Sequence, residues 1–136
     1  MPVVLDASVV LAWHFQDEAS EYADRVLDRV GDEGAIVPPI WPLEVANGLA
    51  MAERRKRVAG ADASRISAAL AALHIDWREL SLNQALGPVL DLALQYGLTA
   101  YDAAYLELAM REGLPLATED EDLRTAAGRA GVPLVE

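Results

Sequence analysis

Short apolar segments alternate with amphipathic segments along the chain, and this alternation constrains its fold more than any other feature. The apolar segments are rich in Val, Ile and Leu and show no polar face, which is typical of strands buried in a parallel sheet. We expect strands at residues 2–6, 35–39, 75–80, 115–118 and 132–136. The other segments repeat apolar residues at helical spacing, and we expect helices at 7–15, 20–30, 41–57, 62–73, 83–96, 99–113 and 121–130.

The order of these segments predicts an α/β fold in which a parallel sheet is covered by helices on both faces. The chain has 136 residues without an internal repeat or linker, so we expect a single domain over residues 1–136. Gly31 is expected to end the second helix, and Gly87-Pro88 to bend the fifth. In such sheets ligands bind beyond the carboxyl ends of the strands, near the point where strand order reverses. Residues that directly follow a strand are therefore the first candidates for a functional site.

Composition excludes several kinds of chemistry. The chain contains no cysteine, which removes disulfides, thiolate nucleophiles and cysteine-ligated zinc; this suits a reducing compartment, and we expect a cytoplasmic protein. The formal net charge is −11, whereas proteins that bind a phosphate backbone normally carry a basic excess. Four of the 11 basic residues lie in the segment ERRKR at 53–57. A nucleic-acid function therefore requires a local basic patch, or cations that neutralise clustered acids.

The apolar start of the chain does not have the pattern of a signal peptide, because Asp6 interrupts it and no basic segment precedes it. No apolar run is long enough to span a bilayer. We therefore expect no membrane partner.

Two candidate site acids follow strands. Asp6 ends the first strand, where a helix N-cap and a functional site are equally good interpretations. Asp120 follows the fourth strand in the sequence LATEDEDL, where an acidic turn exposed to solvent is the simpler interpretation. Asp122 or Glu121 can equally be the working acid of this segment.

Two further acids lie in the first turns of helices. Glu44 shares a helical stripe with Asn47, and the helix dipole alone would explain an acid there. Asp102 forms a capping-box pattern with Thr99, but it also falls on an apolar helix face beside Tyr105. A buried carboxylate needs a partner or a metal ion. Several other acids are expected to be ordinary surface charges of helices: Asp24, Asp28, Glu53, Glu107 and Glu112.

Taken together, Asp6, Glu44, Asp102 and Asp120 are expected to converge on one edge of the sheet. Carboxylates held together repel one another unless a cation lies among them. Oxygen ligands without His or Cys favour Mg²⁺ or Mn²⁺ over zinc. A metal ion in such a cluster activates water and offsets charge on a leaving oxygen, which suits in-line chemistry at phosphate.

Four segments occur in order along the chain: VVLDASVVLAW, PLEVANGL, GLTAYDAAYLELA and LPLATEDEDLRTAA. In these segments the sequence resembles the PIN-domain nucleases, in particular the VapC-type toxins of bacterial toxin–antitoxin pairs. The resemblance spans nearly the whole chain. It implies a three-layer α/β/α sandwich with a central parallel sheet, an acidic site for Mg²⁺ or Mn²⁺, and endoribonuclease activity.

The resemblance also implies roles for individual residues. Asp6, Glu44 and Asp102 match the first three acids of the family, and Asp120 matches the fourth, within the pattern Thr118-x-Asp120-x-x-Leu123. These four acids are therefore the candidate catalytic and metal-binding residues, with Asp122 as the alternative fourth acid. Three polar residues match those that support the metal ligands: Ser8, Asn47 and Thr118.

The partners implied by the resemblance are an RNA substrate, a small antitoxin protein and a second copy of the chain in a homodimer. Arg54, Arg55 and Arg57 are candidate RNA contacts, although basic residues that complement a helix carboxyl end are the simpler interpretation. Four aromatic residues are candidates for a partner surface, although burial in the core explains such residues more often: Trp13, Phe15, Tyr22 and Trp41.

Two other functions compete with a nuclease. An aspartyl-phosphate enzyme would use Asp6 as nucleophile, but a dehalogenase-like phosphatase needs a second Asp where Ser8 stands. A receiver domain needs a lysine after a late strand, and the only lysine is Lys56. A non-catalytic binding module on the same fold is the third hypothesis, and the presence of all four acids argues against it.

Overall fold

The structure, a computed structural model, describes residues 1–15, 18–55 and 60–136. Its described residues form one parallel sheet of four strands in the order β3-β2-β1-β4. The strands are β1 (Val3–Leu5), β2 (Ala35–Val37), β3 (Ile75–Trp77) and β4 (Leu116–Ala117). The helices are α1 (Ala7–His14), α2 (Glu21–Glu33), α3 (Trp41–Arg54), α4 (Gly60–Ala71), α5 (Leu82–Gln84), the π-helical η2 (Ala85–Val89), α6 (Leu90–Tyr96), α7 (Ala100–Glu112) and α8 (Glu121–Ala130).

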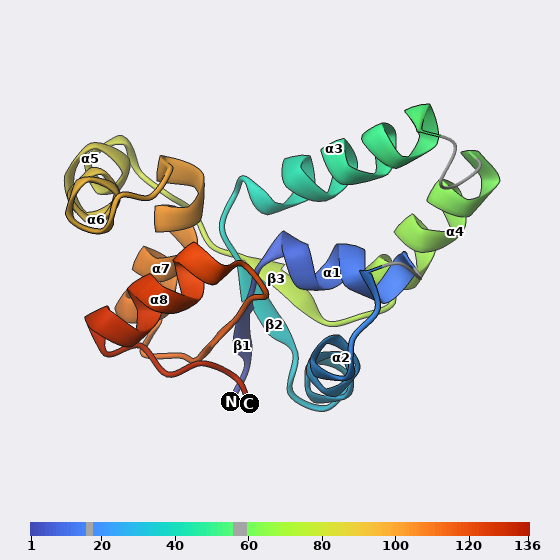
Figure 1. Cartoon of the computed structure of the whole chain (residues 1–136), viewed down its shortest axis with the longest axis horizontal. Coiled ribbons are helices and arrows are strands. Elements are labelled where there is room, and N and C mark those ends of the chain that lie inside the picture. The colour runs from blue at the N-terminus through green and yellow to red at the C-terminus, as the bar shows by residue number, and fades with distance from the viewer. Residues whose placement is uncertain (16–17, 56–59) are drawn as a thin grey trace.

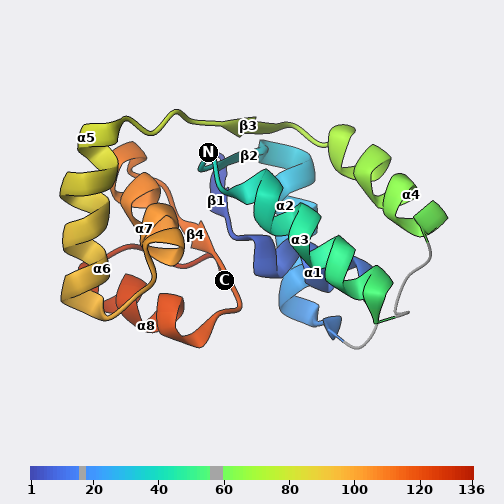
Figure 2. The ribbon, with the colours of Figure 1, turned by 90° about the horizontal axis from the view of Figure 1, so that it is seen from above.

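Helices cover both faces of the sheet. In Figures 1 and 2, α1 to α4 lie on one side of the strands and α5 to α8 on the other. The centre of the molecule is mainly apolar: Val3, Val4 and Leu5 of β1 have no exposed surface, and α7 is buried continuously over residues 103–109. The predicted three-layer α/β/α sandwich with a central parallel sheet is confirmed.

The strand order places a topological switch point beside β1. The chain passes from β1 to β2 and β3 on one side, and then returns to pair β4 with the other side of β1. In the register of the sheet Leu5 lies opposite Ala117. The residues that follow these two strands, Asp6 and Thr118, therefore emerge together at the edge where ligands of such folds bind.

Several element boundaries differ from the sequence-based expectation. Helix α2 continues past Gly31 and ends at Gly34, whose φ of 81° is a backbone conformation that glycine adopts readily. The expected last strand at 132–136 makes only a single bridge, between Leu134 and Leu116, because β4 itself has just two residues. Helix α3 ends at Arg54 rather than at residue 57.

At Gly87-Pro88, where the sequence predicted a bend, the helix contains a π-helical turn. Pro88 lies inside η2, between α5 and α6. Because proline has no N–H to donate within the helix, the normal hydrogen-bond pattern is interrupted there, and a wider turn accommodates the break.

Candidate active site

Asp6 lies at the end of β1 and is anchored by two hydroxyl groups. Its carboxylate is 5% exposed. Its Oδ2 accepts hydrogen bonds from Ser8 Oγ at 2.7 Å and from Thr118 Oγ1 at 2.6 Å. Although Asp6 occupies the N-cap position of α1, its side chain makes no capping hydrogen bond. Of the two interpretations left open by the sequence, N-cap or functional site, the cap is therefore wrong.

The same two hydroxyl groups fasten the loop between β4 and α8 onto Asp6. Thr118 is fully buried, and its Oγ1 accepts a hydrogen bond from the backbone N–H of Asp120 at 3.0 Å. Ser8 Oγ accepts one from the backbone N–H of Glu119 at 3.3 Å. Each hydroxyl group thus donates to the carboxylate and accepts from the loop, so the position of Asp120 is coupled to that of Asp6.

Asp120 caps α8 while it faces the other acids. Its Oδ2 accepts the N–H of Leu123 at 2.9 Å. The charge of Asp120 contributes to raising the pKa of Asp6 after burial, which is the largest cause. Asp122 is exposed in the first turn of α8. Both Asp120 and Asp122 act on Asp102, and Asp120 acts more strongly.

Asp102 lies in the first turn of α7 and is partly buried. Thr99 caps the helix by accepting a hydrogen bond from the backbone N–H of Asp102 at 3.1 Å, so the cap does not use the carboxylate of Asp102. Burial, followed in order of size by the charges of Asp120, Asp6, Glu44 and Asp122, raises the pKa of Asp102 to about 6. The charges that act most strongly on this carboxylate among the described residues are all those of other acids.

Glu44 reaches the cluster from the first turn of α3. Burial is the largest cause that raises its pKa; the charge of Asp6 also raises it, and a hydrogen bond from Tyr105 opposes the change. The Tyr105 hydroxyl group donates to Glu44 Oε1. Asn47, one turn further along α3, is exposed.

The four acids therefore come from four different elements and act on one another electrostatically. Their donor atoms are carboxylate oxygens, which fit a hard divalent cation and do not fit zinc. Within residues 1–15, 18–55 and 60–136, no three His, Cys, Asp or Glu side chains are placed so that they would hold one metal ion. Carboxylates without a cation repel one another, so a bound ion would have to draw these side chains closer together.

Tyr105 was not singled out as a functional residue by the sequence. It lies one turn after Asp102 on α7, and this spacing places both residues on the same helix face. The spacing of Asp102 and Tyr105 is visible in the sequence. The contact with Glu44, however, joins residues 61 positions apart, and no local pattern reveals such a pair.

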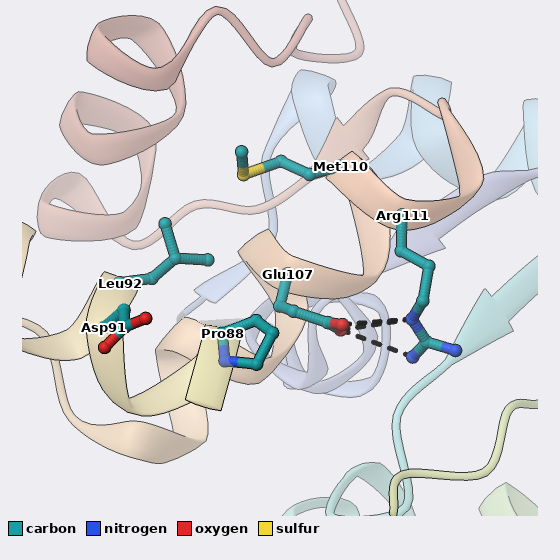
Figure 3. Close-up of a pocket in the computed structure, with 6 residues that line it drawn as sticks. All are labelled: Pro88, Asp91, Leu92, Glu107, Met110 and Arg111. Atoms are coloured by element: carbon teal, nitrogen blue, oxygen red, sulfur yellow. Dashed lines mark hydrogen bonds and ion pairs between the residues drawn. The ribbon is translucent and has the colours of Figure 1, made fainter. Parts of the chain in front are cut away.

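One acid expected at the surface is buried instead. Glu107 on α7 is 5% exposed, and its carboxylate accepts hydrogen bonds from Arg111 Nε at 3.0 Å and Nη2 at 3.3 Å. Figure 3 shows this pair facing a pocket beside Pro88 and Leu92, on the side of α7 that packs against η2 and α6. The expectation that Glu107 is a surface charge was wrong because η2 and α6 cover this face of α7. Arg111 lies four residues after Glu107 on the same helix, and this spacing allows the ion pair to form.

The basic segment lies away from the acids. Arg54 and Arg55 are exposed at the carboxyl end of α3. They lie about 15 Å along the helix from Glu44 at the usual helical rise, in an arm that Figure 1 shows projecting from the sheet with α4. The third candidate, Arg57, lies outside the described residues.

The aromatic residues considered for a partner surface belong to the core. Phe15 and Trp41 are buried, and Trp13 and Tyr22 pack against the core while partly exposed. Large exposed apolar side chains lie elsewhere, mainly on α3, η2, α6 and α7: Leu43, Leu86, Leu90, Leu94, Tyr101 and Met110.

Comparison with known proteins places this geometry in a family. The family model described as PIN domain matches residues 3–129. Ribonuclease VapC3 of Pyrobaculum aerophilum is 32% identical over 123 residues, which cover 90% of this chain and 92% of that protein. Ribonuclease VapC9 of Mycobacterium tuberculosis is 32% identical over 138 aligned positions, which cover 97% of this chain and 95% of that protein.

Two solved structures are similar in fold. The crystal structure of PAE2754 from Pyrobaculum aerophilum has a TM-score of 0.68 and 26% identity, and the match covers 93% of this chain and 84% of that one. A toxin–antitoxin complex from Klebsiella pneumoniae contains a chain with a TM-score of 0.64 and 20% identity, with 96% and 94% covered. The match to the PIN model over most of the chain and the 32% identity to VapC ribonucleases agree, and the chain belongs to the PIN-domain family as a VapC-type member.

Proposed function

We propose that this protein is a metal-dependent endoribonuclease that acts as the toxin of a toxin–antitoxin pair, with its active site at Asp6, Glu44, Asp102 and Asp120. Relatives named as ribonucleases support the activity. The observation that carries the site assignment is that Asp6, held by Ser8 and Thr118 at the switch point of the sheet, lies near enough to Glu44, Asp102 and Asp120 for their charges to act on one another. Such a site gains from a divalent cation and from a phosphate group bound to that cation.

Hydrogen bonds within the protein fix the positions of two of the site acids. Ser8 and Thr118 fix Asp6 through Oδ2, and Thr118 also fixes the backbone of Asp120. When bound, Mg²⁺ or Mn²⁺ would activate water and offset negative charge on the leaving oxygen. The acids of the site, in a protein with a net charge of −11, repel polyanionic RNA until a cation neutralises them. We therefore expect the activity to depend on the metal ion.

The test is cleavage of a mixed RNA pool with Mg²⁺, Mn²⁺ or chelator, followed by mapping of the cut ends. Asp6→Asn and Asp102→Asn should abolish cleavage and cell toxicity, because Asn keeps the shape but loses the charge that holds the cation. Asp24→Asn on the exposed face of α2 is the matched control and should cut normally. Cleavage at the parent rate by both site variants would refute the site assignment.

The competing functions are less well supported. Oδ2 of Asp6 is engaged by two hydroxyl groups, and the residue two positions on is Ser8 rather than the second Asp of a dehalogenase-like phosphatase. A receiver domain would require a lysine after a late strand, and the only lysine of the chain is Lys56. A non-catalytic binding module would give no cleavage product under any of the metal conditions above.

Contact with the RNA backbone is assigned to the basic segment at the end of α3. Arg54 and Arg55 are exposed there, and each phosphate that a cationic side chain neutralises adds to the salt dependence of binding. Replacing Arg54, Arg55 and Arg57 with Gln should weaken RNA binding and flatten its dependence on salt. An unchanged salt slope would leave these residues as ordinary charges at a helix end.

The partner proposed for the acidic site is an antitoxin that inserts an Arg or Lys side chain. A guanidinium group pairs two carboxylate oxygens at once, and an acid cluster without substrate attracts it. A structure of the complex with the antitoxin far from Asp6 and Asp102, leaving these acids open, would contradict this mode of inhibition.

Dimerisation is proposed through an apolar groove of about 470 Å³ between α3, η2, α6 and α7. All its lining residues are uncharged, so two copies with a charge of −11 each can approach there without direct repulsion. Leu43 and Leu86 are 66% and 64% exposed on this face, so the same surface offers both a hollow and projecting side chains, as a two-fold interface requires. Light scattering should report a dimer that Leu86→Glu dissociates and that Leu27→Glu on α2 leaves intact.

Of the described helices, none combines the length and the apolar character needed to cross a membrane.

A further inference from the structure

Tyr105 connects α7 to α3 at the centre of the acidic cluster. Its side chain has no exposed surface and is the largest fully buried one in the core. Its hydroxyl group donates a hydrogen bond to Glu44 Oε1. The ring is therefore held by core packing, while its single polar atom reaches a carboxylate of the proposed site.

The hydroxyl group of Tyr105 is the donor in its hydrogen bond to Glu44. Burial, followed by the hydrogen bond to Glu44, raises the pKa of Tyr105 above its usual range, and the charges of Asp6 and Glu44 add to this effect. The phenol thus keeps its proton. A charge-assisted hydrogen bond from a buried, rigid donor is among the stronger and more directional contacts available to a carboxylate.

Glu44 needs such a contact more than Asp6 and Asp120 do. Asp6 is fixed by Ser8 and Thr118, and Asp120 by its capping bond to Leu123. Glu44 has a longer side chain, is only partly buried, and experiences repulsion from Asp6. Without the bond from Tyr105, this repulsion and rotamer freedom favour conformations that turn the carboxylate away from the cluster.

We propose that Tyr105 is a positioning residue that holds the Glu44 carboxylate toward the acidic cluster by occupying Oε1 and leaving Oε2 for the cation or the RNA. The inference rests on the proposed function of the four acids. The simpler alternative is that Tyr105 has only a structural role in the core, and that its buried hydroxyl group donates to Glu44 because it needs a hydrogen-bond acceptor. The two differ in outcome, because only a positioning role links the hydroxyl group to metal affinity and to the rate of cleavage.

The test compares Tyr105→Phe with Tyr96→Phe. Each variant loses one oxygen atom and keeps the ring, so both should fold, which circular dichroism checks. Tyr96 lies on α6 and contacts Gln95 and Arg129 rather than the acids. Free Mn²⁺, followed by electron paramagnetic resonance, should show affinity lowered on the order of 10-fold in Tyr105→Phe, the scale known for residues that orient metal ligands. Tyr96→Phe should match the parent.

Cleavage kinetics provide the second readout. Tyr105→Phe should lower kcat on the order of 10-fold at saturating metal, with little change in KM for RNA. In a Glu44→Gln background, Tyr105→Phe should lower kcat little further, because the carboxylate that Tyr105 positions has already been removed. Equal losses in both backgrounds would mean that Tyr105 does not act through Glu44, and parent-like kcat and Mn²⁺ affinity would leave it a core residue only.

Asp6→Asn separates this inference from the proposed function. If Asp6→Asn cuts RNA like the parent, the site assignment fails as a whole. If Asp6→Asn is inactive while Tyr105→Phe binds Mn²⁺ and cuts like the parent, the acidic site stands and the positioning role of Tyr105 is overturned.

Discussion

Helix α7 carries two acids that are shielded from solvent, and their surroundings are opposite. Glu107 lies on the side covered by η2 and α6, where Arg111 donates to both of its oxygens. Asp102, five residues earlier, lies on the side that faces the sheet edge, where the charges acting on it are those of Asp120, Asp6, Glu44 and Asp122. Arg111 therefore compensates the negative charge of Glu107 within the fold, whereas the charges named for Asp102 are all negative.

This difference distinguishes Glu107 from the proposed site acid Asp102 more clearly than burial does. Glu107 is the more deeply buried of the two, yet its cation is supplied by the same helix. Asp102 is half-buried, and the charges that act most strongly on it among the described residues are negative. A carboxylate whose neighbours are all acids stores unfavourable energy that a bound cation releases. The following predictions test this contrast.

The largest effect is expected where the internal pair is broken. Arg111→Met leaves the carboxylate of Glu107 buried without a cation, and loss of one partner of a buried pair typically costs 3–5 kcal/mol. Because the Arg111 side chain is 31% exposed, we expect a loss of about 3 kcal/mol in the free energy of unfolding, measured with urea. Arg29→Met is the matched control, since Arg29 and Glu33 form an exposed pair at the same spacing. It should cost at most about 1 kcal/mol. Equal losses in the two variants would show that burial of Glu107 has no energetic consequence.

The second effect concerns added metal. Mn²⁺ at a hundredfold excess over its dissociation constant should stabilise the parent by about 2.7 kcal/mol, because it binds only the folded cluster. Asp102→Asn should lose most of this stabilisation, whereas Glu107→Gln on the same helix should retain it. Calorimetry with Mn²⁺ and with chelator measures both. A parent that gains nothing from Mn²⁺, or a Glu107→Gln variant that loses the gain, would contradict the contrast between the two acids.

The sequence was sufficient to predict the sheet and the identity of the acids that approach its edge. Asp6 directly follows a β-branched run, and strand order in an α/β fold carries such a residue to the ligand-binding edge. Asp102 attracted notice because it interrupts an apolar face. The prediction of the sheet succeeds because strand and helix periodicities are local properties of the chain, whereas the assignment of these acids to a functional site stays a prediction.

The sequence was insufficient where the answer depends on tertiary packing. The spacing of Glu107 and Arg111 is visible in the sequence, but the burial of that pair depends on η2 and α6 covering α7. The bond from Tyr105 to Glu44 joins segments 61 residues apart. Whether Asp6 caps α1 or faces the site was equally undecidable, because both interpretations place an Asp after the strand and only the hydroxyl groups of Ser8 and Thr118 distinguish them.

A smaller effect is expected from pH in the absence of metal. Burial and the neighbouring acids raise the pKa of Asp102 from 3.8 to about 6, so the folded protein binds this proton more tightly than the unfolded chain. The resulting stability is fully present below about pH 4 and is lost as pH rises through about 6. The shift corresponds to about 3 kcal/mol, but Asp102 is about half exposed, so we expect about 1 kcal/mol. In chelator at pH 8, Asp102→Asn should therefore be more stable than the parent by about 1 kcal/mol.

The control for this pH effect is Asp24→Asn on the exposed face of α2. It removes the same charge from a chain of net charge −11 without touching the cluster. Its stability should follow that of the parent across the pH range. If Asp102→Asn were instead less stable than the parent at pH 8, Asp102 would act as a helix-capping residue and not as one of several crowded acids.

The smallest effect distinguishes the two candidates for the fourth acid. Among the charges that act on Asp102, that of Asp120 is the strongest and that of Asp122 the weakest. Asp120 is held toward the cluster by Thr118 and by its bond to Leu123, and Asn can replace it as a cap. Asp120→Asn should therefore lower the pKa of Asp102, followed by nuclear magnetic resonance of its carboxyl carbon in chelator, more than Asp122→Asn does. The accompanying gain in stability should be on the order of 0.5 kcal/mol for Asp120→Asn and smaller for Asp122→Asn. A larger response to Asp122→Asn would assign the fourth position to Asp122, and the capping bond of Asp120 would then be its whole role.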